Sequence, residues 1–164
     1  MNKYVIINGA GGVGKDTFVN KCKIYKDNIL NISTVDYIKS VAKYCGWDGK
    51  KDDRGRKLLS DLKDALTSYD DIPIKNIMQS LEMLDNSIVF IHSREPNEIR
   101  RLKNQLNAKT LLIRNKNVEK VESNHADRDV ENFQYDYVVE NDGTLGDLIM
   151  KCFLFLRWLE YADD

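Results

Sequence analysis

A glycine-rich segment near the start of the chain, from Gly9 to Thr17, constrains the fold of this sequence more than any other feature. It follows an apolar run over Tyr4–Ile7 and comes directly before a pattern typical of an amphipathic helix. The segment matches G-x-x-x-x-G-K-[ST], except that Asp16 stands at the hydroxyl position. In such a strand–loop–helix context, backbone N–H groups turn inward around phosphate oxygens, and Lys15 adds a positive charge. We therefore predict a phosphate-binding loop.

Two other interpretations of the same segment are weaker. The residues Gly9, Gly11 and Gly14 also fit G-x-G-x-x-G, the pattern of dinucleotide-binding folds. That pattern leaves Lys15 unexplained, and no acidic residue ends a second strand at the spacing expected for a ribose contact. A glycine-rich turn without a ligand is the remaining alternative, and the strand before the loop and the helix after it argue against it.

The composition is that of one ordinary α/β domain. The chain has 164 residues, of which 42% are hydrophobic and 31% charged, and its net charge of −1 gives no basic field for nucleic acid. No apolar run is long enough to cross a membrane, and the chain starts on a strand without a signal peptide, so we expect a cytoplasmic protein. The scattered Cys22, Cys45 and Cys152 lie on apolar helical faces and are expected to be reduced core thiols.

Short apolar strands alternate with helical patterns along the chain. This order predicts an α/β fold with a five-stranded parallel sheet and helices on both faces. The expected strands are Lys3–Asn8, Ile29–Ser33, Ile88–His92, Thr110–Arg114 and Tyr135–Glu140. The expected helical stripes run from Phe18 to Tyr25, from Tyr37 to Cys45, from Leu58 to Tyr69, from Ile74 to Leu84 and from Leu145 to Leu159.

Several local signals place helix ends. Pro73 and Pro96 are expected to open helices, and Thr144 with Asp147 has the spacing of a capping box. Phe153, Phe155 and Trp158 lie beyond the apolar stripe of the last helix, where they cover a sheet edge or form a subunit contact.

Two polar segments interrupt the alternation of strands and helices. One runs from Gly46 to Arg56 between two helices, and the other from Asn115 to Asn132 before the last strand. Loops of this length in a compact α/β domain are usually functional. We expect both at the carboxyl edge of the sheet, over the phosphate loop.

Three segments resemble the P-loop nucleoside monophosphate kinase superfamily, with phage-type deoxynucleoside monophosphate kinases and animal-type phosphomevalonate kinases the most similar branches. They are Gly14-Lys15-Asp16-Thr17, Arg94-Glu95-Pro96-Asn97-Glu98 (similar to D-x-R-x-P-N-E) and the closing Tyr135–Gly143. The resemblance implies a three-layer P-loop NTPase fold in one domain, residues 1–164. It also implies a helical acceptor-binding insertion over 35–86 and a short lid over 115–132.

The resemblance further implies an activity and its cofactors. The expected reaction transfers the γ-phosphoryl group of ATP, with Mg²⁺, to a small phosphorylated acceptor, foremost a (deoxy)nucleoside monophosphate. We expect no nucleic-acid or membrane partner and a monomer or homodimer. The residues expected to bind the nucleotide are Gly9, Gly11, Gly12, Val13, Gly14, Lys15, Asp16 and Thr17, with Asn141 and Gly143 on the base side.

Phosphoryl transfer needs cations that converge on the phosphates. The candidate catalytic residues are Lys15, Arg94, Arg128 and Asp36, and the candidate acceptor-binding residues are Asp36, Arg54, Arg56 and Arg94. Each has a plainer alternative. Arg94 then pairs with a surface acid, Arg54 and Arg56 belong to a solvated charge run, and Asp36 caps the next helix. Arg128 is the best lid candidate, supported there by Lys116 and Lys120.

Two positions depart from the resembled patterns. Asp16 replaces the metal-binding hydroxyl, and its carboxylate is a candidate Mg²⁺ ligand because it is a hard oxygen donor. His92 ends the third expected strand where the resembled pattern has Asp, and imidazole is a poor Mg²⁺ ligand, so a strand-end hydrogen bond is its favoured role. Three alternatives remain: phosphomevalonate or dephospho-coenzyme A as acceptor, or a degenerate protein that binds ATP without transfer. A GTP switch is disfavoured because Asn115-Lys116-Asn117-Val118 lacks the acid of N-K-x-D.

Overall fold

The computed structural model describes residues 1–118, 130 and 133–162. The chain forms two compact units, one from Met1–Asn31 together with Asn86–Asp164 and the other from Ile32–Asp85. The second unit spans nearly the stretch that we expected as the helical insertion, 35–86. That this stretch binds an acceptor stays a prediction.

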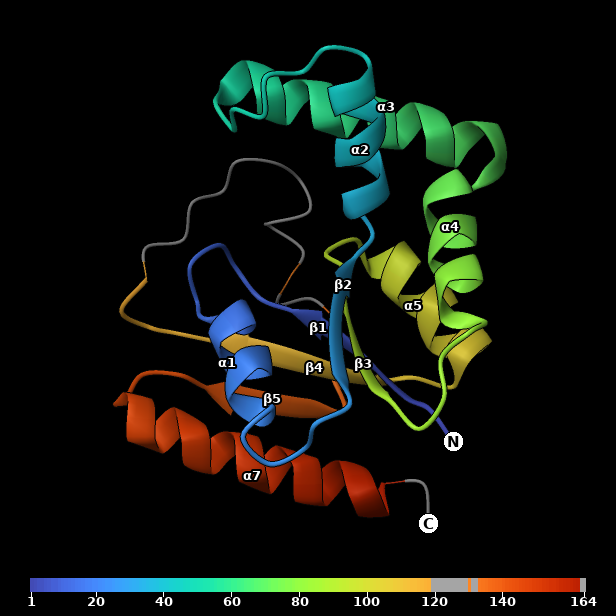
Figure 1. Cartoon of the computed structure of the whole chain (residues 1–164). Coiled ribbons are helices and arrows are strands. Elements are labelled where there is room, and N and C mark those ends of the chain that lie inside the picture. The colour runs from blue at the N-terminus through green and yellow to red at the C-terminus, as the bar shows by residue number, and fades with distance from the viewer. Residues whose placement is uncertain (119–129, 131–132, 163–164) are drawn as a thin grey trace. The chain divides into compact units, whose positions relative to one another are not determined.

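A five-stranded parallel sheet with the order β2-β3-β1-β4-β5 is the centre of the fold, as predicted (Figure 1). Its strands are β1 Lys3–Asn8, β2 Ile29–Ser33, β3 Ile88–His92, β4 Lys109–Arg114 and β5 Tyr137–Glu140. In the register of the central strands, Ile7 of β1 lies opposite His92 of β3 and Leu111 of β4. The carboxyl ends of these strands therefore meet at one edge of the sheet, where α/β folds bind ligands.

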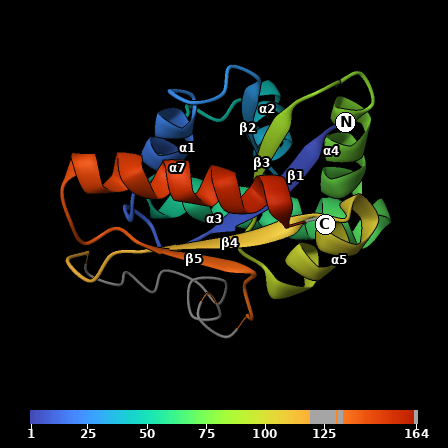
Figure 2. The ribbon, with the colours of Figure 1, turned by 90° about the horizontal axis from the view of Figure 1, so that it is seen from below.

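Helices cover both faces of the sheet. α1 Lys15–Cys22 and α7 Leu145–Tyr161 pack against each other on one face, and α5 Pro96–Leu106 contacts β1 and β4 from the other (Figures 1 and 2). Because side chains alternate along a strand, Val5 and Ile7 of β1 join the core under α1 and α7, whereas Ile6 points to the opposite face. This gives the three-layer architecture that the alternating pattern predicted.

The core under α1 and α7 is built around aromatic rings. Phe155 of α7 is fully buried and makes edge-type contacts with Phe18, at 5.6 Å between centroids, and with Tyr137, at 5.3 Å. Trp158 packs beside Tyr137 at 4.9 Å. Placing Phe155 beyond the apolar stripe was therefore wrong, because α7 buries a face wide enough to include it. Of the three aromatic residues set apart by the sequence, Phe153 is the exposed one, at 41%.

The cysteines divide into a buried pair and an exposed residue. Cys22 of α1 and Cys152 of α7 are fully buried, and the hydrogen bond between their thiols, with burial, raises the pKa of Cys22 far above its ordinary value. Cys45 is exposed, so its expected place in the core is contradicted. The reason is that α2 ends at Tyr44, one residue before it.

The second unit consists of three helices, α2 Asp36–Tyr44, α3 Asp53–Asp70 and α4 Ile72–Leu81. The apolar stripes predicted for α2 and α4 are buried in part: Cys45 of the α2 stripe is exposed, and the buried members are Ile38, Ala42, Ile74, Ile77 and Leu81. The predicted stripe of α3 is not buried, since Leu58 is 43% and Tyr69 is 82% exposed. The buried residue of α3 is instead Gly55.

Local chemistry explains where several elements begin. Pro73 and Pro96 lie in the first turns of α4 and α5, and Thr144 with Asp147 forms the predicted capping box at the start of α7. The last strand starts at Tyr137 rather than Tyr135 because Asp136 is engaged outside the sheet ladder. Its carboxylate accepts hydrogen bonds from the backbone N–H and the hydroxyl of Thr110, each at 2.8 Å. It also forms an ion pair with Lys103.

Within the described residues, no helix has both the length and the apolar character needed to cross a membrane.

Replacing Gly55 with alanine is expected to destabilise the protein by about 1–3 kcal/mol. An alanine Cβ there would lie 2.0 Å from the carbonyl oxygen of Lys50, so the preceding loop must move. Gly146→Ala in α7 is the matched control, because its Cβ would meet nothing closer than 3.6 Å. It is expected to stabilise the protein by up to about 1 kcal/mol through helix propensity. Urea unfolding followed by circular dichroism measures both changes, and equal shifts of one sign would contradict the packing around Gly55.

Asp136→Asn is expected to lower stability at neutral pH, by about 1–2 kcal/mol after allowance for partial solvent exposure. Burial alone raises the pKa of Asp136, but its hydrogen bonds from Lys103 and Thr110 outweigh burial and hold the pKa below its ordinary value. The stabilisation is therefore complete above the unfolded-state pKa of about 4 and is lost as the pH falls through the native pKa. Urea midpoints of both proteins, measured between neutral pH and pH 3, should converge below about pH 4. A gap of constant size would refute this assignment.

Candidate functional site at the carboxyl edge of the sheet

The predicted phosphate loop joins the end of β1 to the start of α1 and depends on two tightly placed glycines. Gly9 has a φ of 144°, and a Cβ there would lie 2.4 Å from the carbonyl oxygen of Ile113 in β4. Gly14, the residue before α1, has a φ of 96°, and its Cβ would lie 2.5 Å from the side-chain amide of Asn141. Side chains are therefore excluded at both positions by conformation and by contact.

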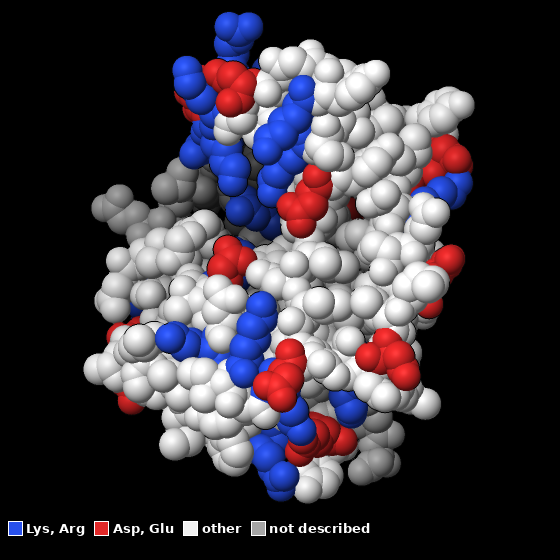
Figure 3. All heavy atoms as spheres, viewed as in Figure 1, with Lys and Arg blue, Asp and Glu red and all other residues white. Residues whose placement is uncertain are grey.

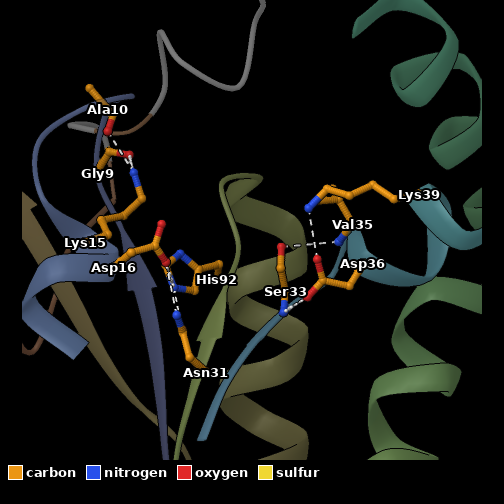
Figure 4. Close-up of polar contacts among 10 residues, drawn as sticks. All are labelled: Gly9, Ala10, Lys15, Asp16, Asn31, Ser33, Val35, Asp36, Lys39 and His92. Atoms are coloured by element: carbon orange, nitrogen blue, oxygen red, sulfur yellow. Dashed lines mark hydrogen bonds and ion pairs between the residues drawn. The ribbon is translucent and has the colours of Figure 1, made fainter. Parts of the chain in front are cut away.

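The side chain of Lys15 folds back onto the backbone of this loop. Its ammonium group donates hydrogen bonds to the carbonyl oxygens of Gly9, at 2.5 Å, and Ala10, at 2.7 Å (Figure 4). The same residue is the first of α1, so its charge lies beside the positive end of the helix. A helix N-terminus and a cation fixed by two hydrogen bonds thus lie together, which is an environment for an anion.

Asn141 and Gly143, the predicted base-side residues, are built into the loop's support. The side-chain amide of Asn141 donates to the carbonyl oxygen of Val13 at 2.9 Å, and its backbone N–H donates to Arg114 at 2.7 Å. A Cβ on Gly143 would lie 2.6 Å from a carboxylate oxygen of Asp147, so glycine there leaves room for the capping box of α7. The segment after β5 therefore supports the phosphate loop through the hydrogen bond between Asn141 and Val13.

A polar contact beside this support was missed by the sequence reasoning. The carboxylate of Asp142 accepts the backbone N–H of Lys116 at 2.8 Å and lies 3.4 Å from its ammonium group. The backbone hydrogen bond from Lys116 is the main cause that lowers the pKa of Asp142. The segment after β4 is thus tied to the segment after β5, and Lys116 of the N-K pair noted in the sequence makes this contact.

Asp16, Asn31 and His92 meet in a second polar cluster, from α1, β2 and β3 (Figure 4). The amide nitrogen of Asn31 donates to Oδ1 of Asp16 at 3.0 Å, and its oxygen lies 2.6 Å from Nε2 of His92. His92 lies 3.6 Å from the same oxygen of Asp16. The predicted strand-end hydrogen bond of His92 is therefore present, and its partner is Asn31, which nothing in the sequence pattern singled out.

The corner that carries Arg94 is held by buried polar groups. The hydroxyl of Ser93 donates to Glu98 at 2.5 Å, and both residues are buried, at 3% and 4% exposure. The backbone N–H of Ser93 bonds to Ile7, and the side chain of Asn8 donates to the carbonyl oxygen of Arg94 at 3.4 Å and to the hydroxyl of Tyr135 at 2.8 Å. Arg94 itself is exposed and follows β3, at the same strand ends as the loop.

Three other predicted site residues lie in the second unit, Ile32–Asp85. Asp36 belongs to the second unit, where its carboxylate accepts the backbone N–H of Ser33 at 3.0 Å and pairs with Lys39 at 2.9 Å (Figure 4). Arg54 and Arg56 also belong to that unit. They lie in the first turn of α3 rather than in a loop, which corrects the expected extent of the polar segment.

Both arginines are exposed, and Figure 3 shows basic side chains gathered over the start of α3. Acidic groups accompany them, and Asp52 caps the helix by accepting the N–H of Gly55 at 2.8 Å. A role in acceptor binding stays a prediction for Arg54 and Arg56. Arg128 and Lys120 lie outside the described residues, as does most of the expected lid.

The oxygen donors at the phosphate loop fit a magnesium ion held mainly by phosphates. The side chain of Asp16 is 80% exposed beside Lys15, and Thr17 follows it on the exposed side of α1. In the described ranges, no group of three or more His, Cys, Asp or Glu side chains forms a self-contained metal site. Mg²⁺ commonly keeps several waters and takes one or two protein carboxylates beside substrate phosphates, which is compatible with a single acid here.

Comparison with known proteins supports the fold at low sequence identity. No protein-family model matches the chain, and no curated protein does. Among solved structures, it is similar to TT1252 from Thermus thermophilus, with a TM-score of 0.60, 17% identity and 98% of each chain covered. It is also similar to dephospho-CoA kinase from Campylobacter jejuni, with a TM-score of 0.55, 14% identity, and 96% of this chain and 97% of that chain covered.

Thymidylate kinase from Ehrlichia chaffeensis is a third similar structure, with a TM-score of 0.51, 13% identity, and 94% of this chain and 98% of that chain covered. Each likeness extends over nearly the whole of both chains, so it concerns the architecture and not a shared motif alone. The chain therefore has the fold found in P-loop kinases.

Proposed function

We propose that this protein is an ATP-dependent phosphotransferase that phosphorylates a small phosphorylated acceptor, with a (deoxy)nucleoside monophosphate as the first candidate. The observation that carries the proposal is the geometry of the phosphate loop. The ammonium of Lys15 is fixed between two loop carbonyls at the N-terminus of α1. A fixed cation beside a helix N-terminus suits a polyphosphate better than a single carboxylate, because several oxygens can be engaged together.

In this proposal the residues act by positioning and by neutralising charge, which is most of what phosphoryl transfer requires. Lys15 exchanges its carbonyl partners for the outer phosphate oxygens of ATP. Arg94, anchored by the Ser93–Glu98 hydrogen bond, holds the acceptor phosphate or the transferred group. Asp16 contributes a ligand to Mg²⁺, which supplies further charge neutralisation on the phosphates when it is bound.

Asp36, Arg54 and Arg56 are the proposed acceptor contacts, and Arg128 of the lid is proposed to reach the transferred phosphoryl group. Non-nucleotide acceptors, phosphomevalonate and dephospho-coenzyme A, are kept as alternatives within the same reaction. A substrate panel that follows ADP release from ATP and Mg²⁺ separates these acceptors from one another.

A protein that binds ATP without transferring phosphate is the second candidate. The observation that favours it is His92, which stands at the strand end where the resembled kinases have an acid and is already bonded to Asn31. This candidate requires ATP binding with no ADP release that depends on any acceptor.

Lys15→Met is expected to lower turnover about 100- to 1000-fold, because it removes a positive charge from the phosphates in the transition state. The fold should be unchanged, since the Asn141–Val13 hydrogen bond and the packing of Gly9 against β4 also hold the loop. Lys23→Met is the matched control, on an exposed lysine just after the same helix, and should keep wild-type turnover. Rates of ADP release and thermal melting curves measure the two effects. Equal turnover of both variants would exclude this mechanism.

Arg94→Ala is expected to reduce kcat/KM for the acceptor about 100-fold or more, and Arg94→Lys should recover only part of it, because an ammonium cannot bind phosphate with two parallel donors. Arg100→Ala, on the exposed side of the same α5, is the control and should have little effect. Initial rates at varied acceptor concentration provide the measurement. An unchanged kcat/KM in the Arg94 variants would remove this residue from the site.

A further inference from the structure

Asn31, in the polar cluster with Asp16 and His92, has no role in the proposed reaction so far. It lies in β2, and its amide connects His92 at the end of β3 to Asp16 in the first turn of α1. The direct distance from His92 to Asp16, 3.6 Å, is too long for a hydrogen bond, so the connection runs through Asn31.

The chemistry of the two neighbours fixes the direction of this amide. The Asp16 carboxylate only accepts hydrogen bonds, so the NH₂ group of Asn31 must face it. The oxygen of Asn31 then faces Nε2 of His92, which must carry a proton in order to donate. A flipped amide would set an oxygen against the carboxylate. The donors therefore run in one direction, from His92 through Asn31 to Asp16.

Stability does not explain this arrangement well. The Asp16 side chain is 80% exposed, and polar contacts to exposed carboxylates contribute little to folding. The buried Ser93–Glu98 bond and the partly buried Asn8–Tyr135 bond differ in this respect, because they satisfy groups that are at least partly shielded from water. The hydrogen bond from Asn31 in β2 orients the exposed carboxylate of Asp16. A ligand of that carboxylate explains this contact better than folding stability does.

Both contacts that the structure gives to Asp16 go to the same oxygen, Oδ1. We propose that Asn31 is a positioning residue that fixes Oδ1 of Asp16 and so presents Oδ2 to the magnesium ion of the bound nucleotide; this rests on the proposed function. Mg²⁺ demands near-ideal octahedral geometry, and a carboxylate is freer to rotate than the hydroxyl it replaces in the loop pattern. Hydrogen bonds from outside the ligand set commonly orient such ligands.

The test is the metal dependence of nucleotide binding, measured by calorimetry without turnover. Asn31→Ala is expected to weaken ATP binding about 10-fold or more when Mg²⁺ is present and to leave ATP binding in EDTA unchanged. The magnesium concentration for half-maximal turnover should rise in parallel. Asn104→Ala, at an exposed asparagine of α5, is the matched control and should behave as wild type. Asn31→Thr, which suits a strand but lacks the amide donor, replaces the alanine variant if that variant does not fold.

A double-mutant cycle with Asp16→Ala separates positioning from a general effect. If Asn31 acts through Asp16, then Asn31→Ala causes no further loss of magnesium-dependent binding once Asp16 is alanine. Additive losses, or equal weakening of ATP binding with and without Mg²⁺, would overturn the inference and leave the proposed function standing. A wild-type protein that binds no ATP in either condition would overturn both.

Discussion

The phosphate loop is held against the ends of β4 and β5, and the positions of the other site residues depend on this. Gly9 passes against the carbonyl oxygen of Ile113 in β4, and Asn141 beyond β5 donates to Val13 in the loop. The loop is thereby held to both strands on one side of β1, and this fixes the direction of α1 and the position of Lys15. Because these contacts hold the loop without a ligand, binding an anion there should cost little ordering of the backbone.

Where the signal was local, the sequence was sufficient to predict the structure. β1, β2 and β3 have the expected bounds, because short apolar runs bounded by polar residues are typical of buried parallel strands. The starts of α4, α5 and α7 follow from Pro73, Pro96 and the Thr144 capping box, all of which act within one helical turn. The apolar stripe of α3 misled the prediction, because amphipathic periodicity shows that a helix has an apolar side and not that this side is covered, as exposed Tyr69 shows.

Within the site, the loop residues were predicted, whereas their partners were not. Asn31, Asp142 and the Ser93–Glu98 pair have no sequence signature, since they meet only after the sheet order brings separate strand ends together. Asn141, predicted on the base side of the nucleotide, also supports the loop in this structure, and its contact with the base stays a prediction. His92 stands where the resembled pattern has an acidic residue, and in the structure its side chain forms a hydrogen bond with Asn31. The two departures from the loop pattern, Asp16 and His92, therefore belong to one hydrogen-bonded cluster and need a joint explanation.

The central claim is that the backbone N–H groups of the loop bind the phosphates of ATP. Amide chemical shifts in ¹⁵N-labelled protein test it directly, with adenosine as the comparison ligand that lacks phosphates. ATP is expected to shift the amide resonances between Gly11 and Lys15, and adenosine at the same concentration is expected to leave them unmoved. Loop resonances that stay in place at saturating ATP, or that move equally with adenosine, would contradict it.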